Sequence, residues 1–157
     1  MAQSDPPRSD GKLYLEDIHP GQRFSSRTQA VDAHQIKAFA REFDPQPFHL
    51  DEAQAKQTLL AGLAASGWHT AAITMRLLVD GGAPIAGGIV GAGAEIAWPN
   101  PTRPGDSLRV ESEVVSVTPS RSRPDRGMVT VRSETLNQRG DIVQILTAKL
   151  IVPRRPA

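Results

Sequence analysis

Residues 59–79 read LLAGLAASGWHTAAITMRLLV and form the most apolar stretch of the chain. In the second half of this stretch, apolar residues recur at the spacing of a helix. They are Ala71, Ala72, Ile73, Met75, Leu77, Leu78 and Val79. We therefore expect a long helix that starts at Ser66 or Gly67 and is buried nearly all round. Asp80, followed by two glycines, should end it.

The second half of the chain changes to the patterns of β-strands. Residues 89–98, 108–117, 128–136 and 142–152 are rich in alternating or continuous apolar residues. Turn sequences separate them, PTRPGD before the second strand and NQRGD before the fourth. One buried helix followed by consecutive strands predicts an α+β fold, in which an antiparallel sheet wraps around a long central helix.

Upstream of the central helix, residues 31–43 carry a second helical stripe. Asp32 and Gln35 form a capping-box pattern at its start, and Asp44 before Pro45 should end it. A loop is then expected to lead into a short helix at residues 51–58. Earlier in the chain, residues 24–29 predict a short edge strand.

Length and composition limit the class of protein. The 157 residues, with 39% hydrophobic and 22% charged residues, suit one soluble domain, which we place at residues 15–153 behind a disordered tail at 1–14. A formal net charge of +1 and 4% aromatic residues argue against a nucleic-acid or membrane partner. The absence of cysteine excludes disulfides and thiol nucleophiles. No apolar run approaches the roughly 20 residues of a membrane span, and no signal-peptide pattern opens the sequence, so we expect a cytoplasmic protein.

The segment FDPQPFHLD, residues 43–51, places chemistry at the end of a helix. Asp44 leaves the helix, two prolines stiffen the chain, and His49 follows. A carboxylate and an imidazole held together can share one water molecule, accept its proton and return a proton. The residues alone leave a second interpretation open, with Asp44 as a helix-end cap and His49 as a surface residue.

This segment resembles the signature of MaoC-like dehydratases and (R)-specific enoyl-CoA hydratases, which have the hot-dog fold. In that pattern, Asp and His hold the catalytic water, which implies that role for Asp44 and His49. The chain departs from the pattern at Phe43, where the family often has Gly, and at Gln46, where it has Asn. Since Gln keeps an amide, we expect that change to be tolerated, whereas Phe43 suggests altered packing around the site.

Two further segments resemble the same family. Residues 59–71 resemble the entry to the central helix, where a backbone N–H receives the thioester carbonyl, and the match assigns that N–H to Gly67. A helix N-terminus independently offers unpaired N–H groups and partial positive charge to an enolate oxygen. A structural interpretation, with Gly67 only easing the helix start, stays open. Residues 95–114 resemble the strand, turn and strand that carry the family's Arg-Pro-Gly-Asp turn.

The resemblance implies a lyase of fatty acid metabolism that hydrates an enoyl thioester, or dehydrates a 3-hydroxyacyl thioester, on coenzyme A or acyl carrier protein. Asp44 is the expected general base, His49 orients the water and assists proton delivery, and the Gly67 N–H stabilises the enolate. Residues expected to bind substrate are Gln46, Pro47, Phe48, Ser66 and Trp68. The implied reaction needs no metal and no cofactor beyond the coenzyme A of the substrate.

A homodimer or dimer of dimers is expected, because a single sheet on a single helix leaves an edge uncovered. Two alternatives stay open, a hot-dog acyl-CoA thioesterase and a non-catalytic acyl-thioester-binding protein. Outside these segments, His19 and His34 are expected on the surface and His69 in helix packing. The basic residues Arg121, Arg123 and Arg126 are expected in a solvated loop with at most a weak role in docking phosphate groups.

Overall fold

Four long or medium strands form most of an antiparallel sheet in the computed structural model, which describes residues 11–157. The strands are β3 (Val90–Ala97), β4 (Ser107–Pro119), β5 (Arg126–Leu136) and β6 (Ile142–Pro153). The short strand β1 (Arg23–Ser25) extends the sheet, giving the order β1-β4-β5-β6-β3, and β2 (Gln29–Ala30) also pairs with β4. The sheet therefore ends at β3 on one side and at β1 on the other.

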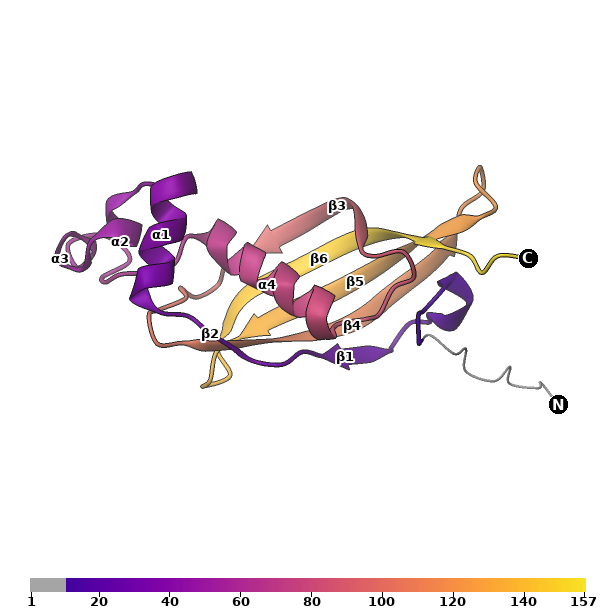
Figure 1. Ribbon diagram of the computed structural model, residues 1–157, viewed down its shortest axis with the longest axis horizontal. Coiled ribbons are helices and arrows are strands. Elements are labelled where there is room, and N and C mark those ends of the chain that lie inside the picture. The colour runs from indigo at the N-terminus through magenta and orange to yellow at the C-terminus, as the bar shows by residue number, and fades with distance from the viewer. Residues whose placement is uncertain (1–10) are drawn as a thin grey trace.

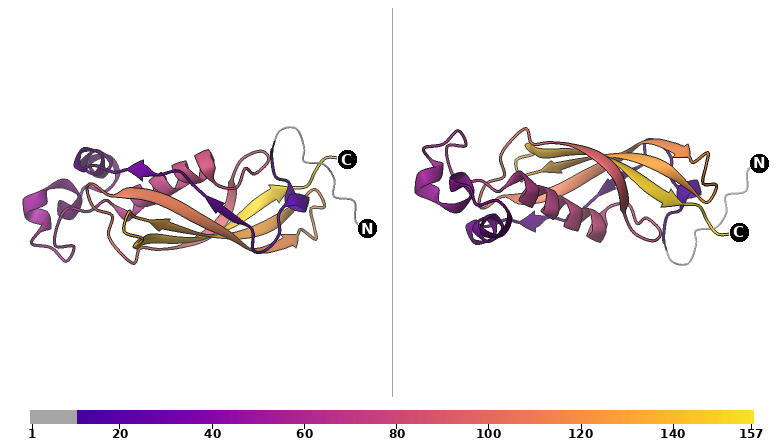
Figure 2. Two further views of the ribbon diagram at one scale, coloured as in Figure 1. Left: turned by 90° about the horizontal axis from the view of Figure 1, so that it is seen from below. Right: turned by 90° about the horizontal axis from the view of Figure 1, so that it is seen from above.

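The central helix α4 (Gly67–Gly81) lies across one face of this sheet (Figure 1). Three helices, α1 (Ala33–Phe43), α2 (Pro47–Leu50) and α3 (Glu52–Ala55), gather beyond one end of the sheet, next to the N-terminal end of α4 (Figure 2). The C-terminus lies at the opposite end. This is the predicted α+β arrangement, in which an antiparallel sheet wraps around a central helix. It brings the end of α1 close to the start of α4.

Apolar side chains that pack against the sheet form two clusters. The first contains Ile36, Ile73, Leu77, Leu108 and Val110, and it joins α1 and α4 to β4. The second contains Leu15, Ile85, Val114, Val129 and Val152, and it joins segments before β1 and after α4 to the sheet. Burial of these groups is the main favourable term in folding, so the first cluster holds α4 to the sheet and the second holds the segment that follows it.

The prediction that α4 is buried nearly all round was wrong for the single chain. Its buried face carries Ile73, Leu77 and two threonines, while Trp68, Met75 and Val79 are exposed. Buried threonines are tolerated because their hydroxyls are paired: Thr74 Oγ1 lies 2.6 Å from Thr135 Oγ1. Three of the seven predicted core residues, Ala72, Met75 and Val79, therefore lie exposed on the outward face of α4.

Helix boundaries in the first half of the chain follow local caps. Asp32 accepts a hydrogen bond from Gln35 N, and the Gln35 side chain completes the capping box of α1. Asp51 caps α3 as expected, but α3 ends at Ala55 instead of residue 58. The segment predicted as a loop after Asp44 folds into α2, because Pro47 stands in its first turn, where a missing N–H costs nothing. The expected edge strand at residues 24–29 is split between β1 and β2.

The predicted boundaries of the domain were too narrow. Most of the expected tail, residues 1–10, lies outside the described residues. Leu13, however, exchanges backbone hydrogen bonds with Pro84 and Ala86, so the domain starts before residue 15. At the other end, Arg155 pairs with Asp17 at 2.6 Å, beyond the predicted end at residue 153. Within residues 11–157, no helix combines the length and the apolar character that crossing a membrane requires.

Candidate active site

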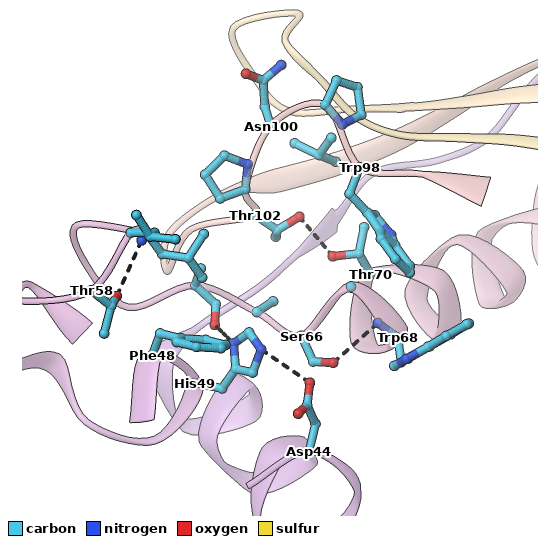
Figure 3. A pocket seen from close by; sticks show the side chains of 18 of the residues that line it. Asp44, Phe48, His49, Thr58, Ser66, Trp68, Thr70, Trp98, Asn100 and Thr102 are labelled. Atoms are coloured by element: carbon cyan, nitrogen blue, oxygen red, sulfur yellow. Dashed lines mark hydrogen bonds and ion pairs between the residues drawn. The ribbon is translucent and has the colours of Figure 1, made fainter. Parts of the chain in front are cut away.

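Asp44 and His49 meet at the junction of α1 and α2. Asp44 is the C-cap of α1, and its backbone N–H donates to Ala40 O. The turn of α2 brings His49 back toward the helix end, so that His49 Nε2 lies 3.2 Å from Asp44 Oδ2. His49 is buried, with 5% of its surface exposed, which excludes the interpretation of a surface residue. The short helix thus places the carboxylate and the imidazole face to face (Figure 3).

The second ring nitrogen of His49 is also held. Nδ1 lies 2.6 Å from the carbonyl oxygen of Ala64, and because a carbonyl oxygen only accepts hydrogen bonds, Nδ1 carries a proton in this contact. In the neutral ring, Nε2 is then an acceptor that faces a carboxylate, which is also an acceptor. The two atoms are at direct hydrogen-bonding distance, so a water molecule would lie beside the pair in the cavity, where it can donate an O–H group to either acceptor. The geometry is therefore suited to holding one water molecule.

Asp44 has further hydrogen-bond partners that keep it ionised. Burial acts to raise the pKa of its carboxyl group, but hydrogen bonds from Ser66 and Gln46, together with the charge that His49 carries when its ring is protonated, outweigh burial and leave the pKa below its ordinary value. Gln46 Nε2 donates to Asp44 Oδ1 at 2.5 Å, so the amide at this position contacts the carboxylate. At neutral pH the carboxylate is a proton acceptor.

Ser66 and Gly67 form the beginning of α4. Ser66 is fully buried and caps the helix by accepting a hydrogen bond from Trp68 N at 3.3 Å. Gly67 is the first helical residue, and its N–H has no acceptor among residues 11–157. This free N–H, at the positive end of the helix dipole, is available to an anionic oxygen.

A cavity of about 750 Å³ joins these groups (Figure 3). Asp44, His49, Ser66 and Gly67 line it, and no other residue in its lining is charged or ionisable. Most of the remaining wall is apolar or aromatic. It consists of Pro47, Phe48, Leu59, Leu60, Ala64, Ala65, Trp68, Trp98, Pro99, Pro101 and Val143, with Thr58, Thr70, Asn100 and Thr102 as uncharged polar members.

Trp98, at the end of β3, forms the wall of the cavity over Gly67. A Cβ atom on Gly67 would lie 2.6 Å from Trp98 Cε2, closer than real contacts allow. The indole therefore packs directly on the glycine, and its Nε1 donates to Gln144 Oε1 at 3.0 Å. The edge of Trp68 meets the same ring, with centroids 5.3 Å apart. Glycine at position 67 is required by this packing as well as by access to its N–H.

Arg103 fixes the segment that leads into α4. Its guanidinium donates to the carbonyl oxygens of Leu60, Gly62 and Leu63, at 2.5, 2.9 and 3.2 Å. Ala61, within this segment, has a φ of 55°, a left-handed conformation that costs an L-residue free energy. The bonds from Arg103 offset that cost. The same segment continues to Ala64, whose carbonyl oxygen holds His49.

The structure brings together most of the residues that the sequence singled out. Asp44, His49 and Gly67 share the cavity, and so do Pro47, Phe48, Ser66 and Trp68. Gln46 does not line the cavity and contacts Asp44 instead. The expectation that Gln46 lines the substrate site is therefore corrected, because Gln46 holds the Asp44 carboxylate instead.

Phe43 packs at the end of α1 and does not line the cavity. Phe43 is exposed and tilts against Phe39, with ring centroids 5.1 Å apart, and Phe39 stacks on His69 at 4.7 Å. His69 is thus a packing residue as expected, and it does not line the cavity. His19 and His34 are exposed, and Arg121 and Arg123 lie exposed in the turn between β4 and β5.

Trp98, Gln144 and Val143 were missed by the sequence analysis. Trp98 stands inside a quoted segment, residues 95–114, and a large aromatic residue next to a Pro-rich turn was a signal that it packs near a site. Gln144 and Val143 had no such signal, since they lie in a strand whose pattern only indicates burial.

The family of the chain follows from comparison with known proteins. A family model described as the MaoC like domain matches residues 17–137. The chain is also 34% identical, over 130 residues, to the uncharacterized protein YdeM of Bacillus subtilis (strain 168), covering 81% of this chain and 89% of that one. The chain therefore belongs to the MaoC-like domain family, which confirms the resemblance seen in its motifs.

Solved structures agree with the hot-dog fold. The crystal structure of the MaoC-like dehydratase from Rhodospirillum rubrum has a TM-score of 0.91 and 65% identity, covering 92% of this chain and 99% of that chain. The unliganded R-hydratase PhaJ1 from Pseudomonas aeruginosa has a TM-score of 0.72 and 25% identity, covering 92% of this chain and 88% of that chain. The predicted fold class is confirmed.

Proposed function

We propose that the protein is a hydratase or dehydratase that interconverts an enoyl thioester and a 3-hydroxyacyl thioester, with acyl-CoA as its substrate. One observation carries the proposal: an Asp44–His49 pair, 3.2 Å apart, shares a cavity with the unpaired N–H of Gly67. The reaction needs two elements. One is a pair of side chains that can exchange protons with the reacting water, and the other is a hydrogen-bond donor for the enolate oxygen. Its similarity to a MaoC-like dehydratase and to an R-hydratase supports the proposal.

In the hydration direction, the water held beside Asp44 and His49 attacks the β-carbon. A carbon–oxygen bond forms while the carboxylate of Asp44 accepts the proton from water. The π electrons move toward the thioester carbonyl, whose oxygen becomes an enolate oxygen and accepts the hydrogen bond from Gly67 N–H. The enolate then collapses and the α-carbon takes up a proton from the Asp44–His49 pair. Dehydration follows the same steps in reverse.

The walls of the cavity suit an acyl thioester. An acyl chain and a thioester are uncharged, and the lining beyond Asp44 and His49 has no charged residue. Apolar walls bind such a group by removing its surface from water. They also exclude water other than the reacting one, which strengthens the hydrogen bond to the enolate oxygen.

We further propose that the active form is a homodimer. β3 forms an edge of the sheet. Seven of its eight residues are exposed, and Ile96 is half-buried. Apart from Glu95, the strand consists of uncharged and mostly small residues such as Gly91, Ala92 and Ala94, and such an edge is a template for pairing with another strand. The β3 edge of a second copy of the chain can pair with the free backbone N–H and C=O groups of this edge, in a two-fold, self-complementary contact.

Incubation of the full-length protein with crotonyl-CoA tests the proposed reaction. Loss of the absorbance of the conjugated thioester, without release of free thiol, is expected, and the product is 3-hydroxybutyryl-CoA. Asp44→Asn protein serves as the control for the site. Release of free coenzyme A at a rate equal to the loss of enoyl absorbance would instead identify a thioesterase and overturn the proposal.

A further inference from the structure

A second, smaller cavity lies under the same helix, toward the other end of the sheet. Its volume is about 50 Å³, and its lining includes Met75, Leu78, Ile85, Leu146 and Leu150. Nearly all of its wall is apolar. The two cavities share no lining residue, so a barrier separates them.

Along α4, β5 and β6, the residues that lie between those lining one cavity and those lining the other form this barrier. On α4, Thr70 lines the large cavity and Met75 the small one, and buried Thr74 lies between them. On β6, Val143 lines the large cavity and Leu146 the small one, with Gln144 between them. On β5, Ser133 lines the small cavity, and Thr135 pairs with Gln144 across the sheet.

The three residues form a polar row across an apolar interior. Thr74 and Thr135 are hydrogen-bonded to each other at 2.6 Å, and this bond ties α4 to β5. Gln144 is next to Thr135 on the same sheet face. A register shift in the pairing of β5 and β6 leaves Val143 as an extra residue, so that Val143 and Gln144 are both buried in succession.

The side chain of Gln144 is only half satisfied. It is fully buried, and its Oε1 accepts the hydrogen bond from Trp98 Nε1 at 3.0 Å. Its Nε2 has no hydrogen-bond partner among residues 11–157. Exchanging the amide oxygen and nitrogen would set two donors against each other at Trp98, so the orientation is fixed.

We infer that Gln144, together with Thr74 and Thr135, closes the inner end of the large cavity and restricts the enzyme to short acyl groups. This inference rests on the proposed function, since it takes the occupant of the cavity to be an acyl thioester. Thr70 and Val143, which line the large cavity, are almost fully buried and precede Thr74 and Gln144 along α4 and β6, so this row borders the large cavity on its buried side.

A steric effect makes the row selective. Its side chains occupy the volume through which a longer chain would have to pass into the small apolar cavity. A short acyl group stops before it reaches these side chains.

The test measures binding of butyryl-, hexanoyl- and octanoyl-CoA, which lack the reactive double bond, so the result does not depend on turnover. Isothermal titration would compare the wild-type protein with Gln144→Ala and Gln144→Leu. Both variants lose the hydrogen bond to Trp98, but only Ala opens the volume, which makes Leu the matched control. Hydration of crotonyl-CoA by the wild type tests the proposed function separately.

The wild type is expected to gain no affinity from hexanoyl to octanoyl. In Gln144→Ala, the preference for octanoyl over butyryl should rise by about tenfold, the value for burying roughly two additional methylene groups. Gln144→Leu should stay within about threefold of the wild type. If Gln144→Ala does not fold, Gln144→Ser makes the same opening with a polar side chain. A wild type whose affinity rises steadily to octanoyl, or an opened variant with an unchanged ratio, would overturn the inference.

Discussion

The carbonyl oxygen of Ala64 holds the imidazole of His49, 2.6 Å from Nδ1, while Nε2 of the same ring faces Asp44. The ring is thereby fixed from both sides, and its tautomer is set by the backbone of a segment remote from α2 in sequence. His49 consequently has a structural contact as well as a chemical role. Substitutions at Asp44 and His49 should separate the two.

Asp44→Asn and His49→Gln should each lower the rate of enoyl-CoA hydration by at least about 10²-fold, because each replaces a group that can take up or deliver a proton with an amide that cannot. The double variant should be little slower than the slower single variant, since residues that act as a unit are strongly non-additive. Initial rates with crotonyl-CoA measure both effects. Full activity in folded Asp44→Asn protein contradicts the mechanism.

His49→Ala should also destabilise the protein, which the sequence alone did not predict. It leaves the buried carbonyl oxygen of Ala64 without a donor, at a cost of about 1–3 kcal/mol in the free energy of unfolding. Asp44→Asn, at a helix end, should change this free energy much less. Urea unfolding of both variants makes the comparison.

Gly67→Ala should impair both turnover and stability, because the new Cβ forces Trp98 off the helix start. The sequence alone predicts that Gly67→Val impairs turnover more than folding. The contact with Trp98 changes that expectation. Thermal melts of Gly67→Ala, Trp98→Ala and the double variant check it: the double variant should be no less stable than Trp98→Ala. If the stability losses of the two single variants add up in the double variant, Gly67 and Trp98 do not share the contact.

The acid limb of the pH–rate profile should reflect Asp44. Its pKa is below the ordinary value, so the carboxylate stays active as pH falls through the usual range for Asp, and Asp44 contributes stability that is lost only as pH falls through the lowered pKa. Ser66→Ala or Gln46→Leu removes a hydrogen bond that lowers this pKa, so the limb should move to higher pH. Gln57→Leu, at an exposed position, is the control and should leave the limb in place.

His69 should make the folded protein sensitive to mild acid. Burial, and then the charge of His49, lower the pKa of His69 below its ordinary value of 6.5, and its Nδ1 has no partner among the described residues. Below that ordinary value the unfolded chain binds a proton that the folded chain resists, so stability falls as pH falls. His69→Phe should flatten the melting temperature between about pH 7 and 5. The exposed His34→Phe variant should keep the wild-type slope.

The protein should sediment as a dimer at micromolar concentration through the edge of β3. Ala94→Lys places a charge on this exposed edge and should shift the protein toward the monomer. Thr118→Lys, on the exposed end of β4, adds the same charge elsewhere and should not. A wild-type monomer in analytical ultracentrifugation would contradict the proposed assembly.

Most elements were predictable because their signals are local. The caps at Asp32 and Asp51, the glycines that follow Asp80, and the alternation in β4 to β6 depend on neighbours in the chain. The buried face of α4 was not predictable in this way. Thr70 and Thr74 read as polar positions, and only their distant partners Thr102 and Thr135 make burial acceptable.

The same distinction applies to the candidate site. Asp44 and His49 come together because a stiff segment of a few residues joins them, and Gly67 follows from the start of a helix. Trp98 and Gln144 reach the site through the pairing of β3 with β6, a contact between strands far apart in the chain. Patterns within single segments carry no information about such contacts.

Arg103 donates hydrogen bonds to the carbonyl oxygens of Leu60, Gly62 and Leu63. These bonds restrict the number of residues that can connect α3 and α4. Surface connections normally accept insertions and deletions. Here, one residue more or fewer would rotate different carbonyls toward the guanidinium and carry Ala64 out of register with the imidazole. This connection can therefore vary in its side chains, but not in how many residues it contains.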